Sequence, residues 1–156
     1  MFDINSAEVR RFFAKVWARR FDLHLSPMEQ KVLKIISAHP EYYSYLEEVE
    51  KYIERVWTGS EAQSNPFLHI SLHLSLQEQI SIDQPPGIAL IHTRLIERTG
   101  GWHAAEHKMM DALTDMIWKA QLHGRGFDVN EYITTLRKLI QLGPEENPRL
   151  NPHEVG

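Results

Sequence analysis

Apolar residues recur at intervals of three and four positions through the first third of the chain. After Ser6, a residue that can cap a helix, they form the one-sided stripe of an amphipathic helix: Val9, Phe12, Phe13, Val16 and Trp17. Ser26-Pro27 starts a second helix with a cap and a first-turn proline, and Pro40 opens a third that extends to Val56. The polar stretch 58–64 then predicts a loop.

The segment 67–82 has a different pattern, in which apolar and polar residues alternate almost strictly. Alternation of this kind is typical of a half-buried strand. The run is, however, roughly three times the modal strand length, the sequence offers no partner strand, and Asn65-Pro66 supplies a helix cap and first position. We therefore expect a helix, with the strand as the alternative. Apolar residues on several of its sides indicate a central, buried helix.

Three further helices are expected in the second half of the chain. They cover Ile88 to Thr99, Trp102 to about Leu122, and a last segment that a capping box at Asp128 starts and Gly143-Pro144 ends. The pattern predicts an all-α protein built as a single compact bundle of about six or seven helices. It places one helical domain at residues 1–142 and a flexible tail at residues 143–156.

Composition narrows the class of protein. A length of 156 residues with 42% apolar and 24% charged residues is typical of one globular domain. The net charge of −4 argues against a dedicated nucleic-acid-binding protein. The absence of cysteine excludes disulfides, thiolate zinc sites and cysteine nucleophiles. No apolar run reaches transmembrane length and the first residues lack the features of a secretion signal, so we expect a cytoplasmic protein.

Two histidine pairs with identical spacing are the strongest chemical signal. His69 and His73 form one pair, and His103 and His107 form the other. Residues four apart lie on the same face of a helix, so each pair would present two imidazoles together. If the two helices face each other, the four imidazoles could bind one divalent metal ion. Zn, Fe, Mn and Ni are the candidates, because the ligands are imidazoles and carboxylates without sulfur.

Glu106 lies within the second pair and is the candidate catalytic residue. On a helical wheel it falls inside the apolar arc, between Leu113 and Ile117. A carboxylate there must be paired, protonated or bound to a cation, because burial of an isolated charge is unfavourable. The alternative is that Glu106 reaches water from the first turns of the helix, where the helix dipole favours negative charge.

Two resemblances to known metalloproteins are weak. His103-x-x-Glu106-His107 resembles the motif of inverted-zincin metalloproteases, which would imply zinc at His103 and His107 with Glu106 as the base. The match covers only five residues, in a chain too short for that family. Paired histidines in a small bundle also resemble those of hemerythrin-like and DinB-like proteins, without a match of motif to motif.

A resemblance that covers about residues 1–140 is more specific. It rests on three segments: Asn65-Pro66-Phe67-Leu68-His69-x-Ser71-Leu72-His73, Glu78-Gln79-x-Ser81-Ile82-Asp83-Gln84-Pro85-Pro86-Gly87-Ile88 and His103-x-x-Glu106-His107-x-Met109-Met110. These segments resemble a bacterial family of small helical proteins described as a domain of unknown function. The resemblance implies a small bacterial cytoplasmic protein and brings no known reaction.

Three functions remain open at this point. The first is metal binding through the paired histidines, with metal-dependent hydrolysis as its catalytic form. The second is an interaction or scaffold protein in which the histidines and Glu106 form a buried hydrogen-bond network without metal. The third is contact between the basic side chains of the first helix and RNA or another acidic partner, and the acidic net charge of the chain disfavours RNA. A homo-oligomer is compatible with all three, and the sequence identifies no partner.

Overall fold

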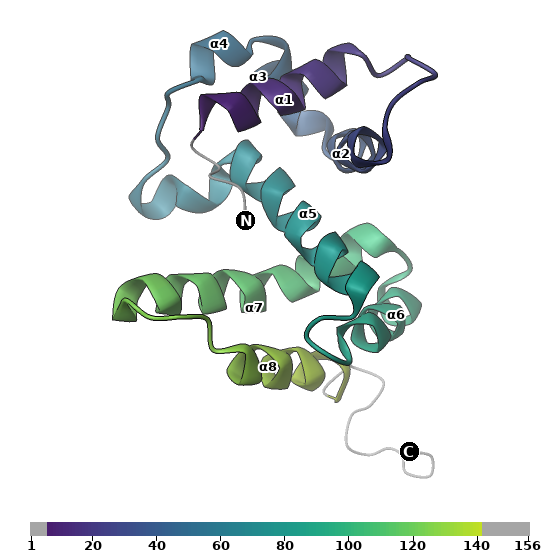
Figure 1. The fold of residues 1–156 in the computed structure, drawn as a ribbon, viewed down its shortest axis with the longest axis vertical. Helices are drawn as coiled ribbons and strands as arrows, with labels where there is room; N and C mark the ends of the chain where they lie inside the picture. The colour runs from purple at the N-terminus through teal and green to yellow at the C-terminus, as the bar shows by residue number, and fades with distance from the viewer. Residues whose placement is uncertain (1–5, 142–156) are drawn as a thin grey trace. The chain divides into compact units, whose positions relative to one another are not determined.

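The computed structural model describes residues 6–141, and every regular element in that range is helical. Eight α-helices and two 3-10 helices follow one another without a strand between residues 6 and 141 (Figure 1). The all-α prediction is confirmed. The tail predicted at residues 143–156 lies outside the described residues.

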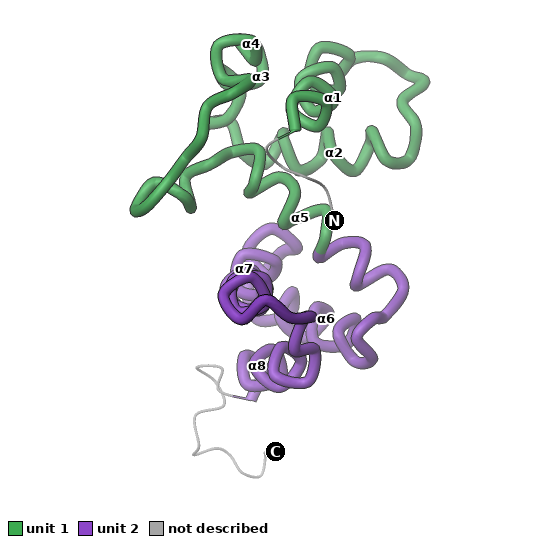
Figure 2. Tube along the Cα trace, turned by 60° about the vertical axis from the view of Figure 1, so that its left-hand side comes forward, with its two compact units in different colours: residues 1–75 green, residues 76–156 purple. Residues whose placement is uncertain are grey.

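The chain divides into two compact units, residues 1–75 and residues 76–156 (Figure 2). Helix α5, Pro66–Ile82, begins in unit 1 and ends in unit 2 as one continuous helix. The single domain expected at residues 1–142 remains a prediction.

Unit 1 is built on two capped helices. In α1, Ala7–Ala18, the Ser6 side chain accepts a hydrogen bond from the backbone N–H of Glu8. In α2, Pro27–Ser37, Ser26 caps the helix as predicted, and Ser26 and Glu29 form a reciprocal capping box. Both helices turn their apolar stripes inward, and the buried residues include Phe13, Val16, Trp17, Val32, Ile35 and Ile36.

The sequence predicts one helix from Pro40 to Val56, but this segment forms three short elements. These are the 3-10 helix η1, Pro40–Tyr42, and helices α3, Tyr43–Glu47, and α4, Val49–Tyr52. Glu48 interrupts the run with φ −119° and ψ 41°. After α4, the buried guanidinium of Arg10 donates hydrogen bonds to the carbonyls of Tyr52 and Arg55, at 2.6 and 2.8 Å. Carbonyl groups at and after the end of α4 therefore accept hydrogen bonds from a distant side chain, where a further helical turn would have supplied backbone N–H donors.

Segment 66–82 is helical, so the strand alternative is wrong. A 3-10 helix, η2, Gly59–Ser64, occupies the predicted loop and leads into α5. The Asn65 side chain accepts hydrogen bonds from the N–H groups of Phe67 and Leu68, at 3.0 and 3.2 Å, as a helix cap does. Apolar residues at every second position distribute around a helix, and α5 accordingly buries residues on several faces: Phe67, Ile70, Leu72, Leu74 and Leu76.

Unit 2 packs three helices against one another: α6, Ile88–Thr99, α7, Trp102–His123, and α8, Val129–Gln141. Asp83 accepts hydrogen bonds from Gly87 N and Ala89 N at the start of α6, and Gly100 ends that helix in the left-handed conformation, φ 95°. The buried Tyr132 of α8 donates its hydroxyl to Gln79 of α5 at 2.6 Å. Burial raises the pKa of the Tyr132 phenol above its usual range.

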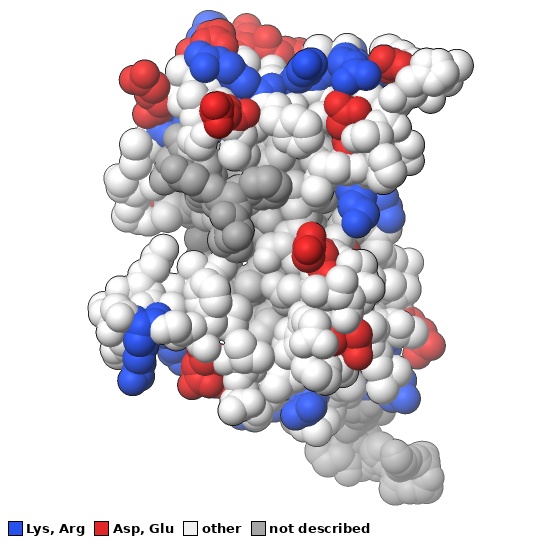
Figure 3. All heavy atoms as spheres, viewed as in Figure 1, with Lys and Arg blue, Asp and Glu red and all other residues white. Residues whose placement is uncertain are grey.

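Several basic side chains in α1 and directly after it are paired with acidic or aromatic groups. Arg11 forms an ion pair with Glu50 at 3.0 Å, and Arg19 contacts both Asp22 and Glu29. The guanidinium of Arg20 lies 4.2 Å from the centre of the Trp17 ring. Figure 3 shows Lys and Arg side chains next to Asp and Glu side chains along α1 on the face in view. Because these cations already have partners, they argue against a surface dedicated to binding phosphate here.

Among residues 6–141, none of the helices is long and apolar enough to cross a membrane.

Candidate metal centre

Three imidazoles lie together within unit 1. His69 and His73 occupy consecutive turns of α5, and their ring centroids are 4.9 Å apart. His39, which follows α2, joins them with ring centroids at 4.7 Å from His69 and 5.1 Å from His73. The predicted pair on α5 thus has a third histidine beside it that the spacing did not indicate.

His39 is buried and its orientation is fixed by the backbone. Its side chain is 1% exposed, and its Nδ1 lies 2.7 Å from the carbonyl oxygen of Ile35 in the last turn of α2. A carbonyl can only accept a hydrogen bond, so Nδ1 carries the proton and donates it. In the neutral ring Nε2 then carries the lone pair that could bind a metal. Metal-binding histidines commonly donate their second ring N–H to a carboxylate, a backbone carbonyl or water.

The spacing of these rings is compatible with a shared metal ion, and it is also within the range of ordinary ring packing. Metal–nitrogen bonds of about 2.0–2.1 Å put each ring centroid about 3 Å from a shared ion. Tetrahedral angles at the ion then separate neighbouring centroids by about 5 Å. The three centroid separations in unit 1, between 4.7 and 5.1 Å, agree with that value.

Tyr42 closes one side of the imidazole group in unit 1. Its ring stacks on His39 at 5.0 Å with an interplanar angle of 4°, and meets His69 edge-on at 5.8 Å. Burial raises the pKa of the Tyr42 phenol to about 12. The phenol therefore stays neutral at physiological pH and acts as an aromatic wall, without the negative charge of a phenolate ligand.

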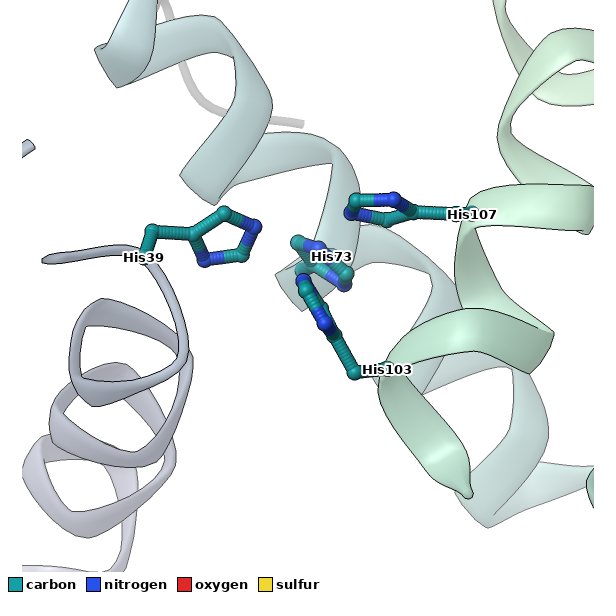
Figure 4. Close-up of side chains that lie close together, drawn as sticks. All are labelled: His39, His73, His103 and His107. Atoms are coloured by element: carbon teal, nitrogen blue, oxygen red, sulfur yellow. The ribbon is translucent and has the colours of Figure 1, made fainter. Parts of the chain in front are cut away.

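Unit 2 holds the second predicted pair at the start of α7. His103 and His107 lie one helical turn apart, with ring centroids at 4.2 Å, and Figure 4 shows both side chains leaving α7. Trp102 lies beside His103 with centroids 5.5 Å apart. His107 is exposed and His103 is partly exposed, whereas His39 and His73 are buried.

Glu106 is buried, with 1% of its surface exposed. The alternative that it escapes to water is therefore wrong. The side-chain amide of Gln77 on α5 donates toward both carboxylate oxygens, at 3.2 and 3.4 Å. The Nε2 atom of His92 on α6 lies 3.6 Å from Oε2 of the same carboxylate. Glu106 thus has an imidazole neighbour, and that neighbour is outside the two predicted pairs.

The structure brings each predicted pair together within its own unit. His69 and His73 lie together in unit 1, while His103, His107 and Glu106 share two turns of α7 in unit 2. Sequence reasoning missed His39 and His92, since neither has a spaced partner on its own helix. Among the residues that the structure describes, His39, His73, His103 and His107 could each supply one imidazole nitrogen to a metal ion.

Comparison with known proteins gives a family without a known activity. No curated protein and no solved structure matches the chain. A family model described as a domain of unknown function, DUF1841, matches residues 5–138, which include all the histidines discussed above and Glu106. The chain belongs to the DUF1841 family.

Proposed function

We propose that this protein binds a divalent metal ion through His39, His73, His103 and His107, the side chains drawn in Figure 4. The observation that carries the proposal is His39, a buried imidazole whose Nδ1–H is held by the Ile35 carbonyl. This contact fixes the tautomer in which Nε2 is the metal-binding nitrogen. Imidazole ligands without sulfur suit Zn, Fe and Ni, and Mn is the remaining candidate.

Contacts within each unit support the proposal. His39 lies beside His73 on α5, and Gln77 follows His73 by one helical turn on the same face. Gln77 donates to Glu106, which lies on α7 between His103 and His107.

His69 remains part of the proposal as a fifth imidazole. Its ring lies 4.7 Å from His39 and 4.9 Å from His73, centroid to centroid. Zinc in a structural site takes four ligands. For a metal with a larger coordination number, His69 is the next nitrogen that could bind.

Metal-dependent hydrolysis is a second candidate, favoured by the position of Glu106 on the turn that carries His103 and His107. A catalytic metal needs an open position for water, whereas four imidazoles complete a tetrahedral site. We therefore place metal binding before hydrolysis. The non-catalytic alternative is a scaffold protein in which the histidines form a hydrogen-bond network without metal.

Metal analysis of the protein purified without a histidine tag and without added metal tests the proposal. We expect about one equivalent of a transition metal per chain, since one site with four imidazole ligands binds such ions tightly. The matched control is the His73→Ala, His107→Ala double variant, prepared in the same way. Metal content below a tenth of an equivalent in the wild type, even after incubation with zinc and desalting, would favour the metal-free network.

A further inference from the structure

The C-terminal half of α7 exposes two large apolar side chains on one face. Trp118 is 55% exposed and Leu122 is 60% exposed, and the two lie one helical turn apart. The loop that follows, at an edge of unit 2 in Figure 1, exposes Phe127, and α8 begins with the exposed Val129. Single exposed apolar residues are common on proteins, whereas several large ones within residues 118–129 are typical of an interaction surface.

This part of α7 contributes no buried side chain to unit 2. The buried residues of α7 end at Leu113, and none of residues 114–123 is buried. A helix in a protein owes most of its stability to the packing of an apolar face. The helix nevertheless continues through this range and ends in a closed turn, in which the backbone N–H of Arg125 donates to the carbonyl of Ala120 at 3.2 Å. A partner surface packed on the two exposed residues would supply the burial that unit 2 does not.

Charges of opposite sign lie on either side of this apolar pair. Asp111 and Asp115 precede the pair and share its face, since at about 100° per residue the four side chains lie within an arc of about 60°. Lys119 contacts both Asp115 and Glu131 at 3.1 Å, so these three groups together carry a net negative charge. On the other side of the pair, the exposed Arg125 supplies a positive charge directly after the end of α7.

We infer that this face of α7 binds the same face of a second copy of the chain, as an antiparallel pair of helices in a symmetric dimer. In a two-fold contact, each residue meets one that lies equally far on the other side of the axis. An axis midway between Trp118 and Leu122 sets the indole of one copy against the leucine of the other. The same axis sets Asp115 against Arg125, because positions 115 and 125 are equally distant from position 120. The face is therefore complementary to itself in its apolar residues and in its charges.

The contact is small, so we expect a reversible dimer. Specific interfaces begin at roughly 1,200 Å² of buried surface, and a single pair of helices lies near that limit. We expect a dissociation constant of roughly 1–100 μM, as for transient contacts. The inference does not depend on metal binding, because the proposed ligands on α7, His103 and His107, precede this face.

Sedimentation equilibrium of the full chain, at concentrations from below to above this range, should show monomers in equilibrium with dimers. Leu122→Gln should weaken the dimer by about 30- to 100-fold, because both copies lose a buried leucine. Leu90→Gln is the matched control, since Leu90 is a leucine of α6 with 55% exposure that lies outside the proposed contact. It should leave the dissociation constant unchanged, and circular dichroism should show both variants folded.

Charge exchange tests the antiparallel arrangement. Asp115→Arg sets two cations against each other across the dimer, and Arg125→Asp sets two anions against each other. Each change should weaken the dimer by about 5- to 30-fold, because each faces a like charge at two symmetric places. The protein with both changes restores opposite charges and should return to within a few-fold of the wild type.

A monomer at every concentration would overturn the inference, and so would a dimer that Leu122→Gln leaves unchanged. Equal weakening by Leu122→Gln and Leu90→Gln would contradict the assignment of the contact to α7. A protein with both charge changes that dimerises no better than the single variants would contradict the antiparallel pairing. The metal content of the wild type is measured separately, so failure of the dimer leaves the proposed metal site standing.

Discussion

Saturating zinc should raise the melting temperature of the protein by about 5–10 °C. A ligand that binds only the native state stabilises it by about 2.7 kcal/mol when its free concentration is 100 times the dissociation constant. For a chain of this length, each kcal/mol corresponds to about 2–4 °C. Differential scanning calorimetry of the metal-free protein, with and without zinc, measures the shift.

Substitution of the proposed ligands should remove this shift and leave the helices in place. The double variant His73→Ala, His107→Ala takes one ligand from each unit and should show no rise with zinc, while circular dichroism remains helical. His24→Ala, His123→Ala is the matched control, because both histidines are exposed and outside the proposed ligand set. A zinc-induced rise that persists in the first double variant, or that disappears in the control, would contradict the assignment of ligands.

Replacement of Arg10 by alanine should destabilise the protein by about 3–5 kcal/mol, which corresponds to about 6–20 °C in melting temperature. Arg10 is 1% exposed and donates to two carbonyls, of Tyr52 and Arg55. Its guanidinium also lies over the rings of Trp57 and Phe67, at 5.4 and 4.9 Å from their centroids. The substitution leaves carbonyl acceptors without this donor, opens a cavity and removes the cation–π contacts.

Arg11→Ala is the control for Arg10, since it removes the same side chain from the next position of α1. Arg11 is exposed and paired with the exposed Glu50, so its loss should change the unfolding free energy by less than about 1 kcal/mol. Denaturant titration of both variants gives the comparison. Equal effects for the two variants would mean that Arg10 does not anchor the segment after α4.

Most helix boundaries could be predicted because their signals are local. Ser26 with Glu29 specifies the start of α2, Asn65 specifies the start of α5, and Gly100 specifies the end of α6. Each of these residues acts on backbone groups within a few positions of itself. Capping interactions between residues this close together can be predicted from a single sequence.

The early end of α4, at Tyr52 instead of Val56, could not be predicted, because the side chain that contacts this segment is distant in the sequence. Arg10 donates to carbonyls 42 and 45 residues away, and nothing in the sequence of residues 40–56 indicates that partner. The apolar–polar alternation of α5 is typical of a strand, although the segment is helical, and this difference also arises from tertiary packing. A helix buried on several sides needs no single apolar face, so its pattern no longer separates it from a strand.

The candidate site was predictable only in the parts that lie on one helix. The spacing of His103 and His107, and the position of Glu106 on the apolar arc of α7, are both visible on a helical wheel. His39 and His92 reach their partners through tertiary contacts, His39 from beyond α2 and His92 from α6. Neither contact leaves a periodic signal in the sequence.

X-ray absorption at the zinc edge of the loaded protein tests most directly whether His39, His73, His103 and His107 bind one ion. We predict a first shell of about four imidazole nitrogens at about 2.0–2.1 Å. His39→Ala in unit 1 and His107→Ala in unit 2 should each lower the imidazole number by one while zinc remains bound. A shell dominated by oxygen, or a loss of imidazole in only one of the two variants, would contradict a metal centre shared by these histidines.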